Sequence, residues 1–287
     1  MRKILITGGS GYLGRVLTAR AVEQFEVYTT HHTQPSEIVA GTPIALDLRQ
    51  RDAVFRCVEA VQPDAIIHTA AINPGGDSSQ MMAVNGEGSA YIAEAAVATK
   101  ARLVHVSSDV VHNGREGAPY PDDAAPTPIN VYGRSKAAGE ARVAAIDPQA
   151  VMVRTSLIYG LAEIDRGTDS FVEQLEAKQT LTLFDDVLRQ PVWIETLATV
   201  LLKLVDLDIS GLLNVVGGQV LTREAFGRRM LTFWKMDHLG IIQAGQAAAI
   251  SDTIPLDLRM DISKGEQLLG MTFPGVDEVL ASFGSSP

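Results

Sequence analysis

A tyrosine and a lysine four positions apart are the residues in this sequence best suited to proton chemistry. Tyr132 and Lys136 open a segment with helical patterning, and residues four apart lie on one face of a helix. A free phenol has a pKa of about 10, and an adjacent ammonium group favours the phenolate, which eases proton donation near neutral pH. Such a pair also occurs by chance, so its meaning depends on what the rest of the chain places beside it.

Ser108 is a second candidate because it follows an apolar run, 103–106, that is typical of a buried strand. Ligands of α/β proteins bind at the carboxyl ends of parallel strands, where we expect Ser108 and Asp109 to lie. The segment 113–130 contains prolines, glycines and acidic residues and is too long for a simple connection in a compact domain. We expect this loop to cover something and to lead into the helix of Tyr132.

A glycine-rich turn near the amino terminus supplies the context that the tyrosine and lysine need. An apolar run breaks into glycines and resumes as a helical pattern; the turn reads Thr7-Gly8-Gly9-Ser10-Gly11-Tyr12-Leu13-Gly14. The spacing fits both G-x-x-G-x-x-G and G-x-G-x-x-G, and each is typical of a turn that presents a helix N-terminus to a dinucleotide pyrophosphate. Glycines also occur at helix starts for packing reasons alone, but the strand before this turn and the helix after it favour nucleotide binding.

The end of the second predicted strand, 26–30, bears on the choice of cofactor. Folds that prefer NAD place an acid there for the ribose 2′-hydroxyl, and those that take NADP accommodate the 2′-phosphate instead. Thr30, His31 and Thr33 lie at this position, with no acid and no arginine beside them, and they could accept a phosphate without repelling it. NADP(H) is therefore favoured, and NAD(H) stays open; the rival interpretation is an ordinary polar loop.

Two further strand ends are expected to contact a bound nucleotide. Asp47 and Leu48 follow the third predicted strand, where the carboxylate is either an adenine contact or a helix cap. Ala70 and Ala71 follow the fourth, and small residues there let the backbone lie beneath a cofactor. His68 ends the apolar run of that strand, a position more typical of a satisfied core histidine than of a catalytic one.

The segment 78–97 has helical periodicity with an unusual insertion, Asn85-Gly86-Glu87-Gly88. Glycine inside a helix costs about 1 kcal/mol relative to alanine. The insertion therefore predicts either close packing or a local distortion of the helix.

Composition excludes several classes of protein. The chain has 287 residues, a formal net charge of −10 and 46% hydrophobic residues, which indicates a sizeable core and argues against nucleic-acid binding. The single cysteine, Cys57, excludes an internal disulfide and a thiolate metal cluster, and we expect no metal site. The first strand begins at once, and no apolar run reaches membrane-spanning length, so we expect no signal peptide, no membrane partner and a cytoplasmic location.

These motifs together resemble the extended short-chain dehydrogenase/reductases. By this resemblance, residues 7–14 correspond to the family's glycine turn and Asp47 to its adenine-contacting acid. Ser108 corresponds to its carbonyl-binding hydroxyl, Tyr132 with Lys136 to its active-site pair, and Asn85 to its helix asparagine, which holds a relay water. The chain is most similar to the dTDP-4-dehydrorhamnose reductase (RmlD-like) branch through Val106-Ser107-Ser108-Asp109, the run 131–140 and Val153-Arg154-Thr155-Ser156.

The chain departs from that branch at two positions. Val110 and Leu157 stand where the branch usually has aromatic residues associated with the sugar-nucleotide pocket. Asp109 is expected to orient substrate, and Arg189 is either a contact for an anionic substrate group or a solvated or structural arginine. We therefore expect the rhamnose precursor to be a poor substrate and another activated keto sugar, or a non-sugar carbonyl, to be preferred.

The fold implied is a doubly wound α/β Rossmann sheet with a small carboxyl-terminal substrate lobe. We expect the Rossmann domain to comprise residues 1–160, completed by about 191–218, and the lobe to comprise 161–190 and 219–287. The implied activity is NAD(P)H-dependent reduction of a carbonyl, with the carbonyl of a nucleotide-linked 4-keto sugar favoured. Two alternatives stay open, a nucleotide-sugar epimerase or dehydratase and a non-catalytic NADP-binding regulatory subunit, and a homodimer is left open as well.

Overall fold

The computed structural model describes residues 1–284, which form two compact units. Unit 1 comprises Met1–Val111, Asn130–Arg154 and Leu197–Leu213, and unit 2 comprises His112–Ile129, Thr155–Thr196 and the described chain from Asn214 onward. The loop 112–129 groups with unit 2 because Tyr120 forms a parallel bridge with Met260. These structural units differ from the sequence-based division in the placement of that loop and of the segments 155–160, 191–196 and 214–218.

Unit 1 is built on a seven-stranded sheet with the order β11-β6-β5-β4-β1-β2-β3. Its strands are β1 (Lys3–Thr7), β2 (Glu26–His31), β3 (Thr42–Ala45), β4 (Ala65–His68), β5 (Arg102–Ser108), β6 (Val151–Thr155) and β11 (Gly211–Asn214). The strands from β5 through β4, β1 and β2 to β3 pair in parallel. The strand order reverses between β1 and β4, which is where doubly wound sheets bind ligands. The predicted α/β Rossmann class is confirmed.

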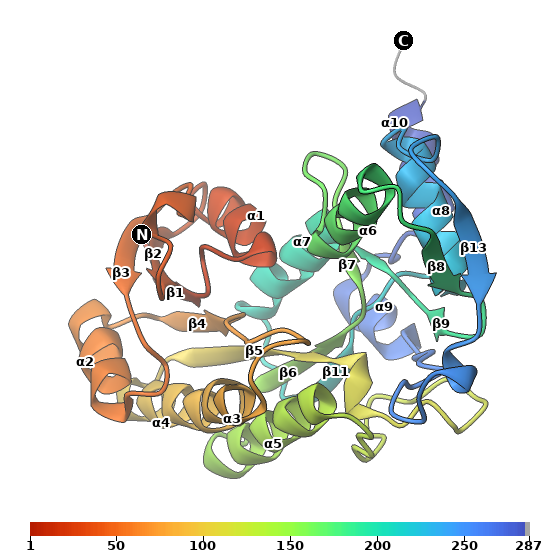
Figure 1. The fold of residues 1–287 in the computed structure, drawn as a ribbon. Helices are drawn as coiled ribbons and strands as arrows, with labels where there is room; N and C mark the ends of the chain where they lie inside the picture. Colours follow the sequence, from red (N-terminus) through yellow and green to blue (C-terminus); the bar gives the residue numbers. More distant parts are fainter. Residues whose placement is uncertain (285–287) are drawn as a thin grey trace. The chain divides into compact units, whose positions relative to one another are not determined.

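Helices cover both faces of this sheet (Figure 1). They are α1 (Tyr12–Ala21), α2 (Arg51–Val61), α3 (Ser78–Met81), α4 (Ser89–Thr99), α5 (Val131–Ile146) and α7 (Ile194–Leu204), with short 3-10 turns at Pro35–Glu37 and Asp109–Val111. The core beneath α2, α4 and α5 joins alternate strand residues such as Leu5, Ile66 and Leu103 to Ile92 and Val143 of the helices. Alternation places these side chains on one sheet face because successive strand residues point to opposite sides.

The segment predicted as one helix over 78–97 is distorted in its middle. Residues Met82–Gly88 form a π-helix between α3 and α4, a feature that usually occurs as a single turn at functional sites. A Cβ added to Gly88 would lie 3.0 Å from the Cβ of Leu48. The glycines therefore serve both of the predicted purposes, local distortion and close packing.

Unit 2 consists of three small strand pairs with helices. β7 (Ile158–Tyr159) pairs with β10 (Val192–Trp193), β9 (Leu188–Arg189) with β12 (Leu221–Thr222), and β8 (Leu181–Phe184) with β13 (Ile242–Gly245). Its helices are α6 (Arg166–Glu176), α8 (Arg223–Phe233), α9 (Ser263–Leu269) and α10 (Val276–Gly284), with a 3-10 turn at Ala247–Ala249. The core of its described residues includes two apolar clusters, one around Tyr159, Phe226 and Met230 and one around Leu175 and Leu231.

The part of the chain that the structure describes contains neither a membrane-spanning helix nor a cluster of metal ligands. None of the helices within 1–284 is both long and apolar enough to cross a membrane. In the same residues, no group of three or more histidine, cysteine, aspartate or glutamate side chains is arranged to hold a metal ion.

Candidate active site

The glycine turn between β1 and α1 is shaped as a cradle for an anion. Gly8 adopts a φ of +74°, and the amide of Gly11 donates to its carbonyl over 2.9 Å. A Cβ on Gly14 would lie 2.1 Å from the same carbonyl oxygen, so only glycine lets α1 approach this closely. Helix α1 starts at Tyr12 and Leu13 without a side-chain cap. Its first amides therefore suit a phosphate group, and the predicted pyrophosphate site fits this geometry.

The end of β2 supports the glycine turn. The Thr30 hydroxyl accepts a hydrogen bond from the Gly8 amide over 3.2 Å, and its residue is only 3% exposed. This hydroxyl therefore helps to hold the glycine turn. His31 is half-buried and follows Thr30 at the strand end.

Asp47 has a partner that the sequence reasoning missed. Both of its carboxylate oxygens accept from the Arg49 guanidinium, over 2.9 and 2.7 Å, and His32 Nε2 lies 3.8 Å from Oδ2. The hydrogen bond from Arg49 holds the pKa of Asp47 well below its ordinary value. A basic residue two positions after a strand-end acid was the available signal. Arg49 adds a positive charge beside the carboxylate expected to contact adenine.

The loop after β4 packs directly against the glycine turn. A Cβ on Gly8 would lie 2.8 Å from the Cα of Ala70, and Ala70 and Ala71 are both half-buried. Leu48, in contrast, is 6% exposed and belongs to the core beneath the helices. The small residues thus allow a close approach of two backbones.

Ser108 and Asp109 are hydrogen-bonded to each other at the end of β5. The Ser108 hydroxyl donates to Oδ1 of Asp109 over 3.2 Å, and Asp109 is fully buried. Val110 follows in the same 3-10 turn and is half-buried. The carboxylate therefore orients the hydroxyl at the sheet edge.

Helix α5 carries Tyr132 and Lys136 past the end of β5. Its start is set by Asn130, whose side chain accepts from the Gly133 amide over 2.7 Å. Tyr132 lies half-buried in the first turn. The Lys136 ammonium donates to the Val106 carbonyl over 2.7 Å, two residues before Ser108. Burial lowers the pKa of Lys136 to about 8. Helix and strand thus bring the lysine to the strand that ends in the candidate serine.

A buried ion pair lies one helical turn beyond Lys136. Glu140 accepts from Arg154 of β6 over 2.9 and 2.7 Å, and both side chains are almost fully buried. The Glu140 carboxylate raises the pKa of Lys136 but does not offset the effect of burial. This bidentate pair attaches α5 to the sheet.

Asn85 connects the π-helix to two other parts of the site. Its Oδ1 accepts from the Ile72 amide over 2.8 Å, and its Nδ2 donates to the Ile72 carbonyl over 3.0 Å. The same Nδ2 donates to Ser135 Oγ over 3.0 Å, and Ser135 in turn donates to the Tyr132 carbonyl over 2.8 Å. The side chain of Asn85 is thus hydrogen-bonded to α5, the helix that contains the candidate acid Tyr132.

The two remaining sequence-predicted residues belong to unit 2. Leu157 packs against the apolar cluster around Tyr159 and Phe226, as does Trp193. Arg189 is 7% exposed, and its Nε lies 3.4 Å from the Ser156 hydroxyl. Sequence reasoning did not single out Trp193 as a neighbour of the same cluster.

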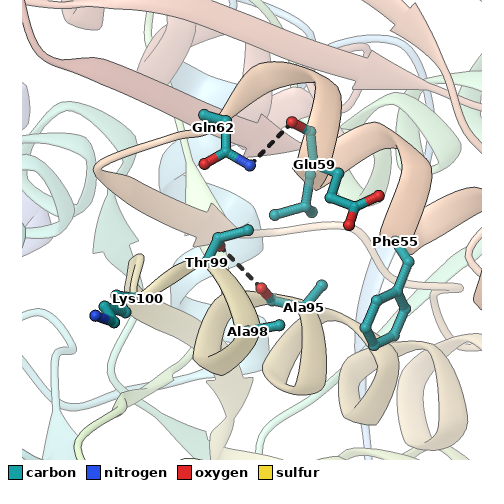
Figure 2. Close-up of a pocket in the computed structure, with 8 residues that line it drawn as sticks. Phe55, Glu59, Gln62, Ala95, Ala98, Thr99 and Lys100 are labelled. Atoms are coloured by element: carbon teal, nitrogen blue, oxygen red, sulfur yellow. Dashed lines mark hydrogen bonds between the residues drawn. The ribbon is translucent and has the colours of Figure 1, made fainter.

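A surface groove between α2 and α4 contains none of these residues. Figure 2 shows its lining, in which Gln62 donates to the Glu59 carbonyl over 3.0 Å and Thr99 donates to the Ala95 carbonyl over 2.9 Å. Its polar groups make ordinary helix-end contacts, so the groove has no part in the candidate chemistry.

The sheet order, the glycine turn after β1, and the tyrosine and lysine on the helix that packs against β5 define an NAD(P)-dependent oxidoreductase of the extended short-chain dehydrogenase/reductase type. The chain belongs to the family described as RmlD substrate binding domain, whose model matches residues 1–283. The predicted resemblance is thereby confirmed.

Named relatives and solved structures agree with this assignment. The chain is 32% identical to a dTDP-4-keto-6-deoxy-D-glucose reductase from Streptomyces niveus over 73% of this chain and 71% of the relative. It is 29% identical to a dTDP-4-dehydrorhamnose reductase from Aggregatibacter actinomycetemcomitans over 74% and 70%. The fold is similar to that of a Bacillus anthracis dTDP-4-dehydrorhamnose reductase in complex with NADP, with a TM-score of 0.84, 22% identity and 99% of each chain covered.

Proposed function

We propose that this chain reduces the carbonyl of a nucleotide-linked 4-keto sugar, with NADPH favoured over NADH as the reductant. The observation that carries the proposal is the Lys136 ammonium held against the end of β5, one helical turn from Tyr132 and two residues from the strand position of Ser108. Relatives named as reductases of dTDP-linked keto sugars support the substrate class.

The cofactor fits the residues of unit 1. The first amides of α1 and the glycines before them would hold the pyrophosphate, and Asp47 would contact the adenine. No carboxylate follows Thr30 and His31 to repel a 2′-phosphate, and Arg49 adds positive charge nearby. When bound, the reduced nicotinamide supplies the hydride. Solved neighbours in this fold contain NADP in one case and NAD in another.

Three side chains would carry the rest of the reduction. Ser108 would donate a hydrogen bond to the substrate carbonyl oxygen and so polarise it. Tyr132 would give its phenolic proton to that oxygen as the carbonyl carbon is reduced. The Lys136 ammonium would stabilise the phenolate left behind and bond the nicotinamide ribose.

Both units contain residues that we expect to recognise the substrate. In unit 1, Asp109 orients Ser108 and Val110 follows it. In unit 2, Arg189 would contact the diphosphate of a nucleotide sugar, since a buried guanidinium suits bidentate phosphate binding. Leu157 would face the sugar or base beside the apolar cluster.

A panel of nucleotide-linked keto sugars tests this function. NADPH and NADH oxidation is followed with each compound, and the alcohol formed is quantified. We expect at least one sugar to consume one equivalent of reduced cofactor per alcohol formed. Interconversion of sugars without net cofactor consumption would indicate an epimerase or dehydratase instead, and cofactor binding with no turnover of any compound would indicate a regulatory subunit.

A further inference from the structure

A chain of hydrogen bonds runs through unit 1 from Thr7, the first residue of the glycine turn, through Asn85 to the carbonyl of Tyr132. Every linking side chain is buried, with at most 1% exposed. The links are Thr7 Oγ1 to His68 Nδ1 at 2.6 Å, His68 Nε2 to Ser89 Oγ at 3.1 Å, Ser89 Oγ to the Asn85 carbonyl at 2.8 Å, Asn85 Nδ2 to Ser135 Oγ at 3.0 Å, and Ser135 Oγ to the Tyr132 carbonyl at 2.8 Å.

Because each hydroxyl has only one hydrogen to donate, the donor and the acceptor of each hydrogen bond to His68 can be assigned. The Ser89 hydroxyl donates its one hydrogen to the Asn85 carbonyl, so the Ser89 oxygen accepts a hydrogen bond from His68 Nε2–H. The other ring nitrogen then carries no proton and accepts from the Thr7 hydroxyl. His68 is therefore the neutral tautomer protonated at Nε2, and it acts as donor and acceptor at once.

The ring stays neutral at working pH. Burial and the nearby positive charge of Lys136 lower the pKa of His68 to about 3. The parallel register places Thr7 opposite His68 on neighbouring strands. Ser89 is the first residue of α4 and follows the π-helix directly. One imidazole thus joins the end of β1 to the start of α4.

We propose that His68 is a positioning residue of the reductase site, which holds the π-helical turn of Asn85 through Ser89 and thereby fixes Ser135 and the first turn of α5 relative to the glycine turn. The proposal rests on the proposed function, because it assigns to Tyr132 the role of proton donor. A small displacement of such a donor costs on the order of 10- to 10²-fold in rate.

Ser89→Ala tests the link with a matched control on the same helix. Thr99 also donates its hydroxyl to the carbonyl four residues back, Ala95, over 2.9 Å but has no histidine partner. We expect Ser89→Ala to lower kcat about 10-fold or more and Thr99→Val to leave it near the parent value. The dissociation constant of NADPH should be nearly unchanged in both.

A matched pair at His68 separates its two bonds. The amide of Gln reaches the position of Nε2 and can still donate to Ser89, whereas the amide of Asn reaches only the position of Nδ1. We expect His68→Gln to keep most of kcat and His68→Asn to lose as much as Ser89→Ala does. Equal activity in the two variants would overturn the proposal, as would a loss confined to NADPH affinity.

Amide hydrogen exchange gives a readout that does not depend on turnover. In Ser89→Ala, the peptide that contains 131–136 should exchange faster than in the parent and in Thr99→Val. Unchanged exchange would contradict the link even if activity fell. If no keto sugar were turned over while exchange responded as expected, the proposed function would fail and the structural link would stand.

Discussion

The Lys136 ammonium group lies in a buried position, where loss of hydration disfavours the charged form. The side chain is 3% exposed, and burial lowers its pKa to about 8 in the absence of cofactor. Its charge has two proposed uses, stabilising the Tyr132 phenolate and bonding the ribose, and both need the protonated form. The same burial that orients the lysine therefore sets an upper pH limit on its function.

This limit predicts the alkaline side of the pH profile. Because the lysine is protonated below its pKa, kcat/KM should be retained below pH about 8 and fall as pH rises through that value. Steady-state kinetics across this range measures the fall. In Lys136→Arg, whose guanidinium stays charged, the fall should shift to higher pH or disappear. An unchanged midpoint in that variant would assign the titration to another group.

The end of β2 predicts the cofactor preference. NADPH should bind at least as tightly as NADH, because the residues there offer no carboxylate to a 2′-phosphate. His31→Asp should reverse the preference, since it adds an acid at the strand end while leaving the Thr30 bond to Gly8 intact. Fluorescence titration of both cofactors provides the measurement. A strong native preference for NADH would refute the argument.

Residue types and spacing were sufficient to find most of the candidate chemistry. The glycine turn, Ser108, and Tyr132 with Lys136 stand out because each has a distinctive neighbourhood in the sequence. The Arg49 pair with Asp47 and the bonds of His68 do not, because they depend on side-chain geometry and on which strands lie side by side. His68 was interpreted as a satisfied core histidine, and the structure shows bonds to both ring nitrogens.

At the level of elements, α5 packs closely against the π-helix at a glycine, Gly139. A Cβ on Gly139 would lie 2.4 Å from the Asn85 carbonyl oxygen. Ser89 donates to that same oxygen. The π-helix therefore presents its carbonyl to a helix that cannot carry a side chain at the point of contact.

Gly139→Ala should disturb the site by separating these elements. The added methyl meets backbone, which cannot move aside cheaply, so we expect a loss of roughly 1–3 kcal/mol in the free energy of unfolding and a fall in kcat. Urea unfolding and steady-state kinetics measure the two effects. Gly284→Ala is a control, because a Cβ there meets nothing within 4 Å. Parent-like stability and kcat in Gly139→Ala would show that α5 accommodates the methyl without moving Tyr132.

Strands were easier to predict than the helix that contains Asn85. Apolar runs bounded by polar residues located β4 at its observed limits, Ala65–His68, and the helix of Tyr132 to within one residue at each end. The π-helix was foreseen only as an unspecified distortion. Its geometry depends on packing against Leu48 and α5, which local periodicity does not encode.

For the molecule as a whole, the absence of two aromatic residues is the main departure from the rhamnose branch. Val110 and Leu157 replace side chains that would each add roughly 0.5–1.5 kcal/mol of stacking beyond area burial. We therefore predict that dTDP-4-dehydrorhamnose is a poor substrate and that another activated keto sugar or a non-sugar carbonyl is preferred. Steady-state kinetics decides this. A kcat/KM of about 10⁵ M⁻¹s⁻¹ or higher would show that other aromatic residues, such as Trp193, restore the stacking.

The division into units was the least predictable property of the chain. The loop 112–129 lies between Ser108 and Tyr132 in the sequence, yet it pairs with the distant segment around Met260. Such pairing joins positions far apart in the chain and leaves no local signal. The assignment of substrate binding to unit 2 stays a prediction, carried by Leu157 and Arg189.

The most direct test of the account is the turnover of Tyr132→Phe with the best keto-sugar substrate, measured beside its affinity for NADPH. Loss of one hydroxyl disturbs little packing, so the dissociation constant of NADPH should stay nearly unchanged. We predict that kcat falls by a factor on the order of 10² or more, the usual contribution of a positioned proton donor. Turnover at the parent rate would show that Tyr132 is not the acid and would contradict the mechanism.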